Sequence, residues 1–509
     1  MNPVRVRFAP SPTGPLHIGG VRTALYNYLL ARKTGGTIIL RIEDTDQTRF
    51  VPGAEEYIKE ALEWVGIELD ESPWHGGPHV PYRQSERKPM YMQYAMQLVE
   101  SGNAYYAFDT SEELDEMRKR LEAARVPDPK YNSITRMQMK NSLTMPEDEV
   151  KEWLASGKPY VIRFKIPRKE EVRFQDMIRG WVMVHSSTLD DKVLMKSDGM
   201  PTYHLANVVD DYLMKITHVI RGEEWLPSAP LHVLLYKAFG WESVMPEFAH
   251  LPLLLKPDGN GKLSKRDGDM GGYPVFPLEW KDEASGSTWM GFRESGFLPD
   301  ATMNFLAFLG WNPGTHEELF NKQELIEAFT IERIGKSGSK FDINKAKWFN
   351  QEYLKRKEDR FLGEYLGKEL EKDGIKAQAE KLNKIAGLMK DRIMFLKDLK
   401  PETTFFFITP TSYDEQVAAS KWNAEAVEAA KAWGEGLKTL TDFNAESVKH
   451  LLHELLEAKG IKLGKVMQAL RLAITGRGQG PDLMHIIEII GKDEAIKRLE
   501  NAVNNLKAV

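Results

Sequence analysis

The chain of 509 residues is longer than a single hydrophobic core supports, so we expect several domains. Its composition, 42% hydrophobic and 28% charged, is that of a folded globular protein and excludes a largely disordered chain. Cysteine is absent, which excludes disulfides and cysteine-ligated zinc, and the net charge of −5 confines any RNA-binding surface to local patches.

The first predicted elements are a strand, a turn, a helix and a second strand within residues 4–43. Residues 4–9 are β-prone, apolar side chains then recur at helical spacing over 18–29, and residues 37–42 follow a Gly-Gly pair. This order is typical of the opening of a parallel α/β sheet. No apolar run approaches the roughly 20 residues that span a bilayer, and no export signal is recognisable, so we expect a cytoplasmic protein without a membrane partner.

The α/β rhythm is interrupted and then resumes. Residues 105–184 are irregular and charged, which indicates an insertion, whereas a strand at 216–221, a helix at 230–239 and an apolar run at 251–255 continue the sheet. Beyond residue 341 nearly everything is predicted to be helical.

Two short motifs point to phosphate chemistry. Residues 12–20 form a turn rich in proline and glycine that brings His17 and two glycines to the start of a helix, where free N–H groups and the helix dipole favour a polyphosphate. Residues 257–268 place Lys262 and Lys265 in a glycine-rich loop, where two ammonium groups can stabilise departing pyrophosphate. The alternative interpretations are a tightly packed turn and a solvated basic loop.

Together, these motifs resemble the two signatures of class I aminoacyl-tRNA synthetases, and they stand here as His17-Ile18-Gly19-Gly20 and Lys262-Leu263-Ser264-Lys265-Arg266. Gly20 and Arg266 depart from the class consensus in the way that the glutamyl branch does. Five longer strings resemble the bacterial glutamyl enzymes: residues 9–14, 41–46, 81–87, 201–211 and 219–225.

The resemblance implies an α/β Rossmann-type catalytic domain in two halves, 1–104 and 185–255, that flank an α+β insertion for the tRNA acceptor end at 105–184. A lysine-loop and stem-contact region at 256–340 and an all-α anticodon-binding region at 341–509 would follow.

The implied reaction joins L-glutamate to tRNA(Glu) through a glutamyl-adenylate made from ATP with Mg²⁺. The implied glutamate pocket consists of Arg7, Ala9, Ser11, Glu43, Tyr203, Asn207 and Arg221. The implied ATP site consists of Ser11, His17, Gly19, Gly20, Glu224, Trp225, Leu253, Leu254 and Lys265, and the implied catalytic group of His17, Gly19, Lys262 and Lys265. The charges fit, because a carboxylate substrate needs a bidentate cation and its ammonium needs a carboxylate. The alternative for Arg7 is a strand residue in a solvent salt bridge.

Further expectations concern RNA and metals. Residues 336–360 contain eight basic and four acidic side chains with interleaved aromatic residues, and 459–481 contain five basic and no acidic ones. By resemblance, Arg392 would read the third anticodon base and reject glutamine tRNA, bound tRNA would precede glutamate activation, and the enzyme would be a monomer. No zinc is expected, and residues 267–291 form an insertion without an assigned function.

Three other kinds of protein are alternatives to this interpretation. A glutaminyl-tRNA synthetase would carry a different first signature and a β-barrel anticodon module, and the helical C-terminal third disfavours it. The short paralogue that modifies a tRNA base lacks an anticodon domain. A catalytically silent RNA-binding relative is disfavoured by the presence of His17, Lys262 and Lys265.

Overall fold

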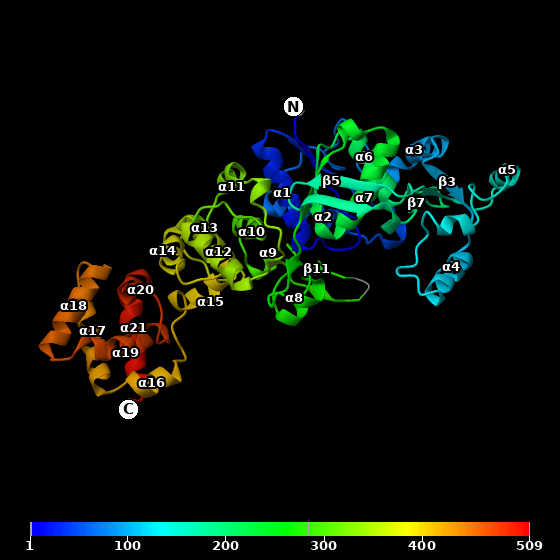
Figure 1. Ribbon diagram of the computed structural model, residues 1–509. Helices are drawn as coiled ribbons and strands as arrows, with labels where there is room; N and C mark the ends of the chain where they lie inside the picture. Colours follow the sequence, from blue (N-terminus) through cyan, green and yellow to red (C-terminus); the bar gives the residue numbers. More distant parts are fainter. Residues whose placement is uncertain (1–2, 283–284, 508–509) are drawn as a thin grey trace. The chain divides into compact units, whose positions relative to one another are not determined.

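The computed structural model describes residues 3–282 and 285–507, which form two compact units. Unit 1 comprises residues 1–294 and 299–343, and unit 2 comprises residues 295–298 and 344–509. Figure 1 shows strands and helices mixed in unit 1 and helices in unit 2.

Parallel strands form the centre of unit 1. β1 (Arg5–Phe8) pairs with β2 (Thr37–Leu40), and α1 (Ile18–Lys33) connects them. β8 (His218–Gly222) pairs in parallel with β9 (Glu247–Leu251), and the N–H of Thr217 donates to the carbonyl oxygen of Arg5 at 2.9 Å, so β8 begins beside β1. The carboxyl ends of these strands therefore lie at one edge, where α/β folds bind ligands.

Residues 105–184 contribute mostly antiparallel pairing. β5 (Glu171–Asp176) pairs with β6 (Gly180–His185), and Asp176 also lies opposite Phe248, which joins β5 in parallel to β9. A second sheet contains β3 (Ala104–Ala107), β4 (Val161–Phe164) and β7 (Val193–Met195). The helices of this segment are α4 (Ser111–Ala123) and α5 (Glu147–Ala155).

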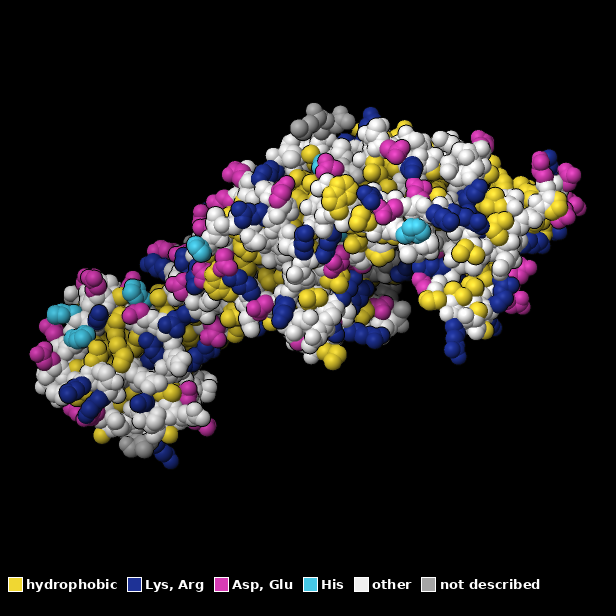
Figure 2. Space-filling view, viewed as in Figure 1, with side chains coloured by type: hydrophobic (Ala, Val, Ile, Leu, Met, Phe, Trp, Pro, Cys, Tyr) yellow, Lys and Arg dark blue, Asp and Glu magenta, His cyan; other side chains and the backbone are white. Residues whose placement is uncertain are grey.

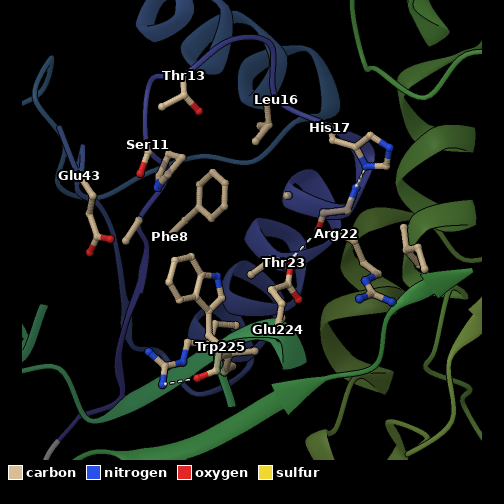
Figure 3. A pocket seen from close by; sticks show the side chains of 18 of the residues that line it. Phe8, Ser11, Thr13, Leu16, His17, Arg22, Thr23, Glu43, Glu224 and Trp225 are labelled. Atoms are coloured by element: carbon tan, nitrogen blue, oxygen red, sulfur yellow. Dashed lines mark hydrogen bonds between the residues drawn. The ribbon is translucent and has the colours of Figure 1, made fainter. Parts of the chain in front are cut away.

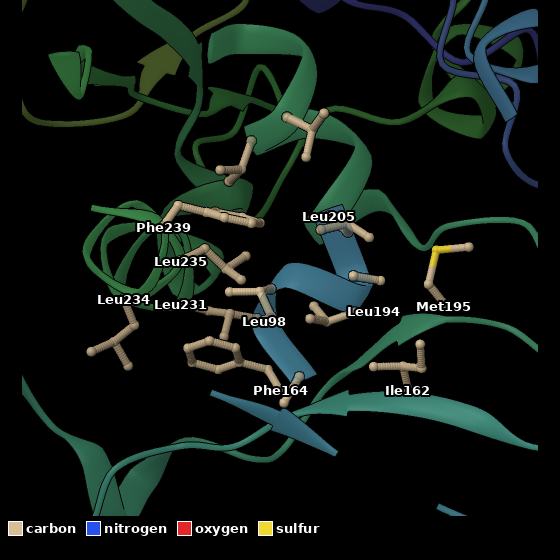
Figure 4. Close-up of a cluster of buried hydrophobic side chains, with 14 of the residues drawn as sticks. Leu98, Ile162, Phe164, Leu194, Met195, Leu205, Leu231, Leu234, Leu235 and Phe239 are labelled. Atoms are coloured by element: carbon tan, nitrogen blue, oxygen red, sulfur yellow. The ribbon is translucent and has the colours of Figure 1, made fainter. Parts of the chain in front are cut away.

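A hydrophobic core fixes the helices behind the sheet edge (Figure 4). It joins the three-stranded sheet to α3 (Lys88–Glu100), α6 (Tyr203–Leu213) and α7 (Ala229–Phe239). Leu205 and Val208 of α6 are buried in it, and each such side chain stabilises the fold by roughly 1.5–3 kcal/mol. Because this face of α6 is anchored, Tyr203, Asn207 and Asp211, spaced four residues apart, share another face.

The remaining elements of unit 1 are short helices and strands, apart from α2. They are α2 (Ala54–Val65), β10 (Leu254–Leu255), α8 (Lys265–Gly271), β11 (Trp280–Lys281), β12 (Thr288–Trp289), α9 (Phe292–Ser295), α10 (Pro299–Ala307), α11 (Lys322–Ala328) and β13 (Ser339–Lys340). β10 pairs in parallel with β13, and β11 pairs antiparallel with β12.

Unit 2 has no strand within residues 344–507. Its helices are α12 (Ile343–Arg356), α13 (Asp359–Glu371), α14 (Ala379–Met389), α15 (Leu399–Thr403), α16 (Glu415–Lys421), α17 (Ala424–Thr439), α18 (Ala445–Ala458), α19 (Leu463–Thr475), α20 (Leu483–Ile490) and α21 (Lys492–Asn505). The predicted fold class, an α/β domain followed by an all-α region, is confirmed.

The surface carries both signs of charge. Figure 2 shows basic and acidic side chains interspersed over both units on the face in view. Within the described ranges, no helix has the length and apolar character required to cross a bilayer.

Candidate functional site

A cavity of about 410 Å³ opens at the carboxyl ends of β1, β2 and β8 (Figure 3). The residues predicted to hold glutamate all line it: Arg7, Ala9, Ser11, Glu43, Tyr203, Asn207 and Arg221. The predicted nucleotide and catalytic residues line it too, with the exception of Lys265: His17, Gly19, Gly20, Glu224, Trp225, Leu253, Leu254 and Lys262. In Figure 3, Glu43 and His17 lie on opposite sides of the group of side chains.

His17 caps the first helix of the fold. Its Nδ1 accepts the N–H of Gly19 at 3.1 Å, and its Nε2 is buried without a partner in the described part of the chain. Burial, together with the positive charges of Lys262 and Lys265, lowers the pKa of His17 to about 4. The ring is therefore neutral, with Nδ1 as acceptor and the proton on Nε2, where it can be donated to a ligand.

Glycines stand in the turn before this helix and in the first turn of the helix itself. A Cβ on Gly20 would lie 2.5 Å from Cδ1 of Leu16. Gly14 has a φ of +125°, and a Cβ there would lie 3.3 Å from Nζ of Lys265. Gly14 thus lets the turn pass close to the lysine loop, and Gly20 leaves the N-terminus of α1 uncovered by a side chain.

A buried charge network forms the side of the cavity around Glu43. Nε of Arg7 donates to Oδ1 of Asp211 at 3.1 Å, and Nη1 of Arg41 donates to the same oxygen at 2.8 Å. Nη2 of Arg41 and Nδ2 of Asn207 donate to Oε1 of Glu43 at 2.9 and 3.0 Å. Oε2 of Glu43 and Nη1 of Arg7 have no protein partner among the described residues, so an anionic and a cationic group remain available to a ligand. The alternative of a solvent salt bridge fails for Arg7, because only 3% of it is exposed.

Arg221 approaches the cavity from β8. Its Nη1 donates to the hydroxyl of Tyr203 at 2.7 Å, its Nη2 to the carbonyl oxygen of Trp225 at 3.4 Å and its Nε to His250 at 3.0 Å. The rings of Tyr203 and Trp225 lie 4.5 Å apart between centroids. Each Nη retains a second N–H, so the guanidinium can still bind a carboxylate.

The lysine loop is tethered at several points. Nζ of Lys262 bonds to Oε1 of Glu224 at 2.9 Å. Partial burial alone would raise the pKa of Glu224, but this contact lowers it overall. Asp267 accepts hydrogen bonds from Ser264 and pairs with Lys256 at 2.9 Å, and the two contacts lower its pKa to about 2.

Lys265 lies outside the cavity lining, next to the 267–291 insertion. Its Nζ is 5.8 Å from the ring centroid of Phe276, and the same ring makes an edge contact with His17 at 6.1 Å. The carbonyl oxygen of Val275 accepts the N–H of Ile18 at 3.0 Å. The insertion thus contacts both motifs.

Several contributors were not identified from the sequence. Arg41 and Asp211 lie within quoted strings, but their pairing spans 170 positions and leaves no local signal. Arg22 of α1 lines the cavity and donates to the carbonyl oxygens of Pro252 and Leu309. His250 supports Arg221 and lies within β9, directly before the apolar run at 251–255, where the sequence alone suggests only a core residue.

Arg392 lies in unit 2, just after α14, and is exposed. Burial lowers the pKa of Arg471, and the positive charge of Arg392 adds to this effect. Phe349 is fully buried and Trp348 is half-buried, which supports the packing interpretation of these aromatic residues. Across residues 3–282 and 285–507, no group of three or more His, Asp or Glu side chains is arranged to hold a metal ion.

Comparison with known proteins places the chain among translation enzymes. Residues 3–348 match the family model of the catalytic domain of class I tRNA synthetases (E and Q), and residues 354–503 match an anticodon-binding domain. Proteins named glutamate–tRNA ligase from Cytophaga hutchinsonii and Amoebophilus asiaticus are 68% and 60% identical, over 99% and 98% of this chain and 98% of each relative.

A solved structure is similarly close. It is described as a glutamate tRNA ligase from Elizabethkingia meningosepticum in complex with its amino acid, and it is 52% identical with a TM-score of 0.95. The match covers 99% of this chain and 100% of that one.

Proposed function

The chain belongs to the glutamate–tRNA ligase family of class I tRNA synthetases, and on that premise we propose that its cavity is where L-glutamate reacts with ATP. The enzyme makes glutamyl-tRNA(Glu) for translation. The α-carboxylate of glutamate attacks the α-phosphorus of ATP, forms the mixed anhydride and releases pyrophosphate. The 2′-hydroxyl of the terminal adenosine then attacks the anhydride carbonyl and releases AMP. The protein supplies alignment and charge stabilisation rather than a nucleophile.

The glutamate end of the cavity is the side of Arg7, Glu43 and Arg221. The observation that carries this assignment is the unpaired Oε2 of Glu43 within a cavity that also exposes N–H groups of two arginines. Oε2 receives the α-ammonium group, and the guanidinium groups of Arg7 and Arg221 receive carboxylate. Ala9, Ser11, Tyr203 and Asn207 complete this pocket.

The nucleotide occupies the side of His17. Its Nε2–H and the open N-terminus of α1, with Gly19 and Gly20, receive phosphate oxygens. Glu224, Trp225, Leu253 and Leu254 line the adenosine part, with Ser11 between the two substrates. Lys262 leaves Glu224 and, with Lys265, stabilises the pyrophosphate as it departs.

Mg²⁺ arrives with ATP in this proposal. Magnesium binds mainly through substrate phosphates and water with one or two carboxylates, so a dedicated protein cage is not required. No cysteine-ligated zinc takes part, because the chain lacks cysteine. We further propose a cytoplasmic monomer that needs bound tRNA before it activates glutamate.

Pyrophosphate exchange with ATP, dependent on glutamate and tRNA, tests the assignment. Lys265→Ala should slow exchange by about a hundredfold, the scale for one transition-state cation, while tRNA binding is unchanged. Normal exchange in this variant would contradict the role of the loop.

The anticodon side is proposed to discriminate between tRNAs. Arg392 is exposed just after α14, and in this proposal it reads the third anticodon base. Purified glutamine tRNA should be a poor substrate. Arg392→Gln should reduce the ratio of kcat/KM for tRNA(Glu) to kcat/KM for glutamine tRNA. Efficient charging of glutamine tRNA by the unaltered enzyme would refute discrimination.

A further inference from the structure

Arg221 is held from behind by a buried histidine at the end of β9. Nε of Arg221 lies 3.0 Å from Nε2 of His250, whose side chain is fully buried. A guanidinium carries only donors, so Nε2 of His250 must accept. The ring proton therefore resides on Nδ1, which lies 2.5 Å from Oδ2 of Asp176.

Asp176 is itself fixed by the backbone. Its Oδ1 accepts the N–H groups of Ile178 at 2.9 Å, Arg179 at 2.8 Å and His250 at 3.3 Å. The other oxygen, Oδ2, is left for the imidazole. Its side chain is as buried as that of His250, so this carboxylate has one orientation and one partner ring.

We propose that Asp176 and His250 are positioning residues that set the orientation of Arg221 toward the substrate carboxylate. Asp176 fixes the tautomer of His250, and the tautomer in turn makes Nε2 an acceptor that holds Nε of Arg221. With Nη1 also tied to Tyr203, the remaining N–H groups of Arg221 have a fixed direction. The inference rests on the proposed function, in which Arg221 binds glutamate.

Asp176→Asn tests the interaction between Asp176 and His250 with little change in the shape of the side chain. The amide oxygen can keep the three backbone N–H groups, which turns the amide NH₂ toward Nδ1 of His250. Two donors cannot face each other, so the proton moves to Nε2 and opposes Nε–H of Arg221. We expect the KM for glutamate to rise about tenfold or more, the scale of one lost charged hydrogen bond, whereas the KM for ATP stays within about twofold.

Asp191→Asn is the matched control. Asp191 is equally buried and accepts bonds from Tyr105, Arg136 and the N–H of Ile166, away from Arg221. This variant should lower stability and leave the KM for glutamate unchanged. An unchanged glutamate KM in folded Asp176→Asn would overturn the proposal, as would an equal rise in both variants.

His250→Gln and His250→Leu keep the proposal testable if Asp176→Asn does not fold. The glutamine amide oxygen can accept from Nε of Arg221 and should largely restore the KM for glutamate, whereas leucine cannot. Equal KM values in these two variants would contradict the role of the histidine.

Two further measurements separate this inference from the proposed function. Nitrogen NMR of histidine-labelled enzyme should show His250 protonated on Nδ1 in the unaltered protein and on Nε2 in Asp176→Asn. The same tautomer in both proteins would refute the proposal that Asp176 fixes the tautomer of His250. Arg221→Ala should raise the KM for glutamate more than Asp176→Asn does. An unchanged KM for glutamate in Arg221→Ala would refute the assignment of the glutamate pocket. The NMR measurement would still test whether Asp176 fixes the tautomer of His250.

Discussion

Two functions are combined in His17. Nδ1 closes the first turn of α1, and Nε2 remains for a ligand. The lowered pKa keeps the ring neutral at physiological pH, so phosphate binding does not require a proton from solution. In the proposed site, the positive charge near the phosphates comes instead from Lys262, Lys265 and the helix dipole.

His17→Asn should separate the two functions. Asparagine is a good helix cap, so the free energy of unfolding should change by less than about 1 kcal/mol. The phosphate donor is lost, and loss of such a donor typically costs about 10²–10³ in rate. Pyrophosphate exchange measures the loss of the phosphate donor, and urea unfolding measures the change in stability. A large loss of stability with normal exchange would refute the proposed separation of the capping role from the phosphate-binding role.

The pH dependence of stability should reflect buried neutral histidines. Burial lowers the pKa of both His17 and His204 to about 4, whereas in the unfolded chain histidine titrates near 6.5. Between these values the unfolded state binds more protons, so the free energy of unfolding should fall as the pH falls from about 6.5 toward 4. Urea unfolding at several pH values gives the free energy of unfolding as a function of pH. This dependence should be shallower for His204→Gln than for the unaltered protein. Parallel slopes for the variant and the unaltered protein would contradict this.

Among the elements, α1 has its N-terminus between two segments that are distant in sequence. The turn at residues 12–17 leads into it, and the 267–291 insertion caps it through Val275 and contacts His17 through Phe276. Tyr57 of α2 donates to the carbonyl oxygen of Leu278 at 2.5 Å, which anchors the insertion to unit 1. Through these contacts the insertion can affect the position of the lysine loop.

Phe276→Ala should loosen both motifs at once. The ring contacts His17 and lies near Lys265, so its loss should lower the maximal rate of pyrophosphate exchange by up to about a hundredfold, the scale of a ~1 Å misplacement of catalytic groups. The KM for glutamate should remain unchanged. Met270→Ala is the control, because this side chain of α8 is 88% exposed. Equal rates for the two variants would show that the insertion does not position the site.

At the scale of elements, prediction was most accurate where the pattern was local. The helix predicted at 230–239 is α7, Ala229–Phe239, and the strand, helix and strand predicted within 4–43 are β1, α1 and β2. The attachment of β5 to β9 was not predicted, because one register pair between Asp176 and Phe248 has no periodic signature.

Across the whole molecule, the net charge of a surface patch depends on side chains that are distant in sequence. Residues 459–481 contain no acid, yet Lys459 pairs with Glu428 and Lys465 with Glu425 of α17. Arg477 pairs with Glu402. Part of the basic patch inferred from sequence is therefore neutralised, and exposed pairs of this kind contribute little to stability.

The two units should respond differently to ligand. The cavity is lined by unit 1 alone, so a non-hydrolysable glutamyl-adenylate analogue should stabilise that unit, by about 2.7 kcal/mol at a hundred times its Kd. Calorimetry should show an upward shift of the unit 1 transition while that of unit 2 stays in place. A single transition that shifts as a whole would show that the units unfold together.

The sequence by itself determined the family and the fold class and predicted most of the residues that line the cavity, because contiguous motifs such as His17-Ile18-Gly19-Gly20 encode a local turn and its donors. Tertiary structure alone decided how those groups are held: the Arg41 bridge between Glu43 and Asp211, the support of Arg221 by His250 and Asp176, and the contact of Phe276 with His17. These pairs are separated by 2 to 259 positions, and most join side chains from different strands and loops. Hydrogen bonds and charges act over a few ångströms in space, so their partners become visible only when the chain is folded.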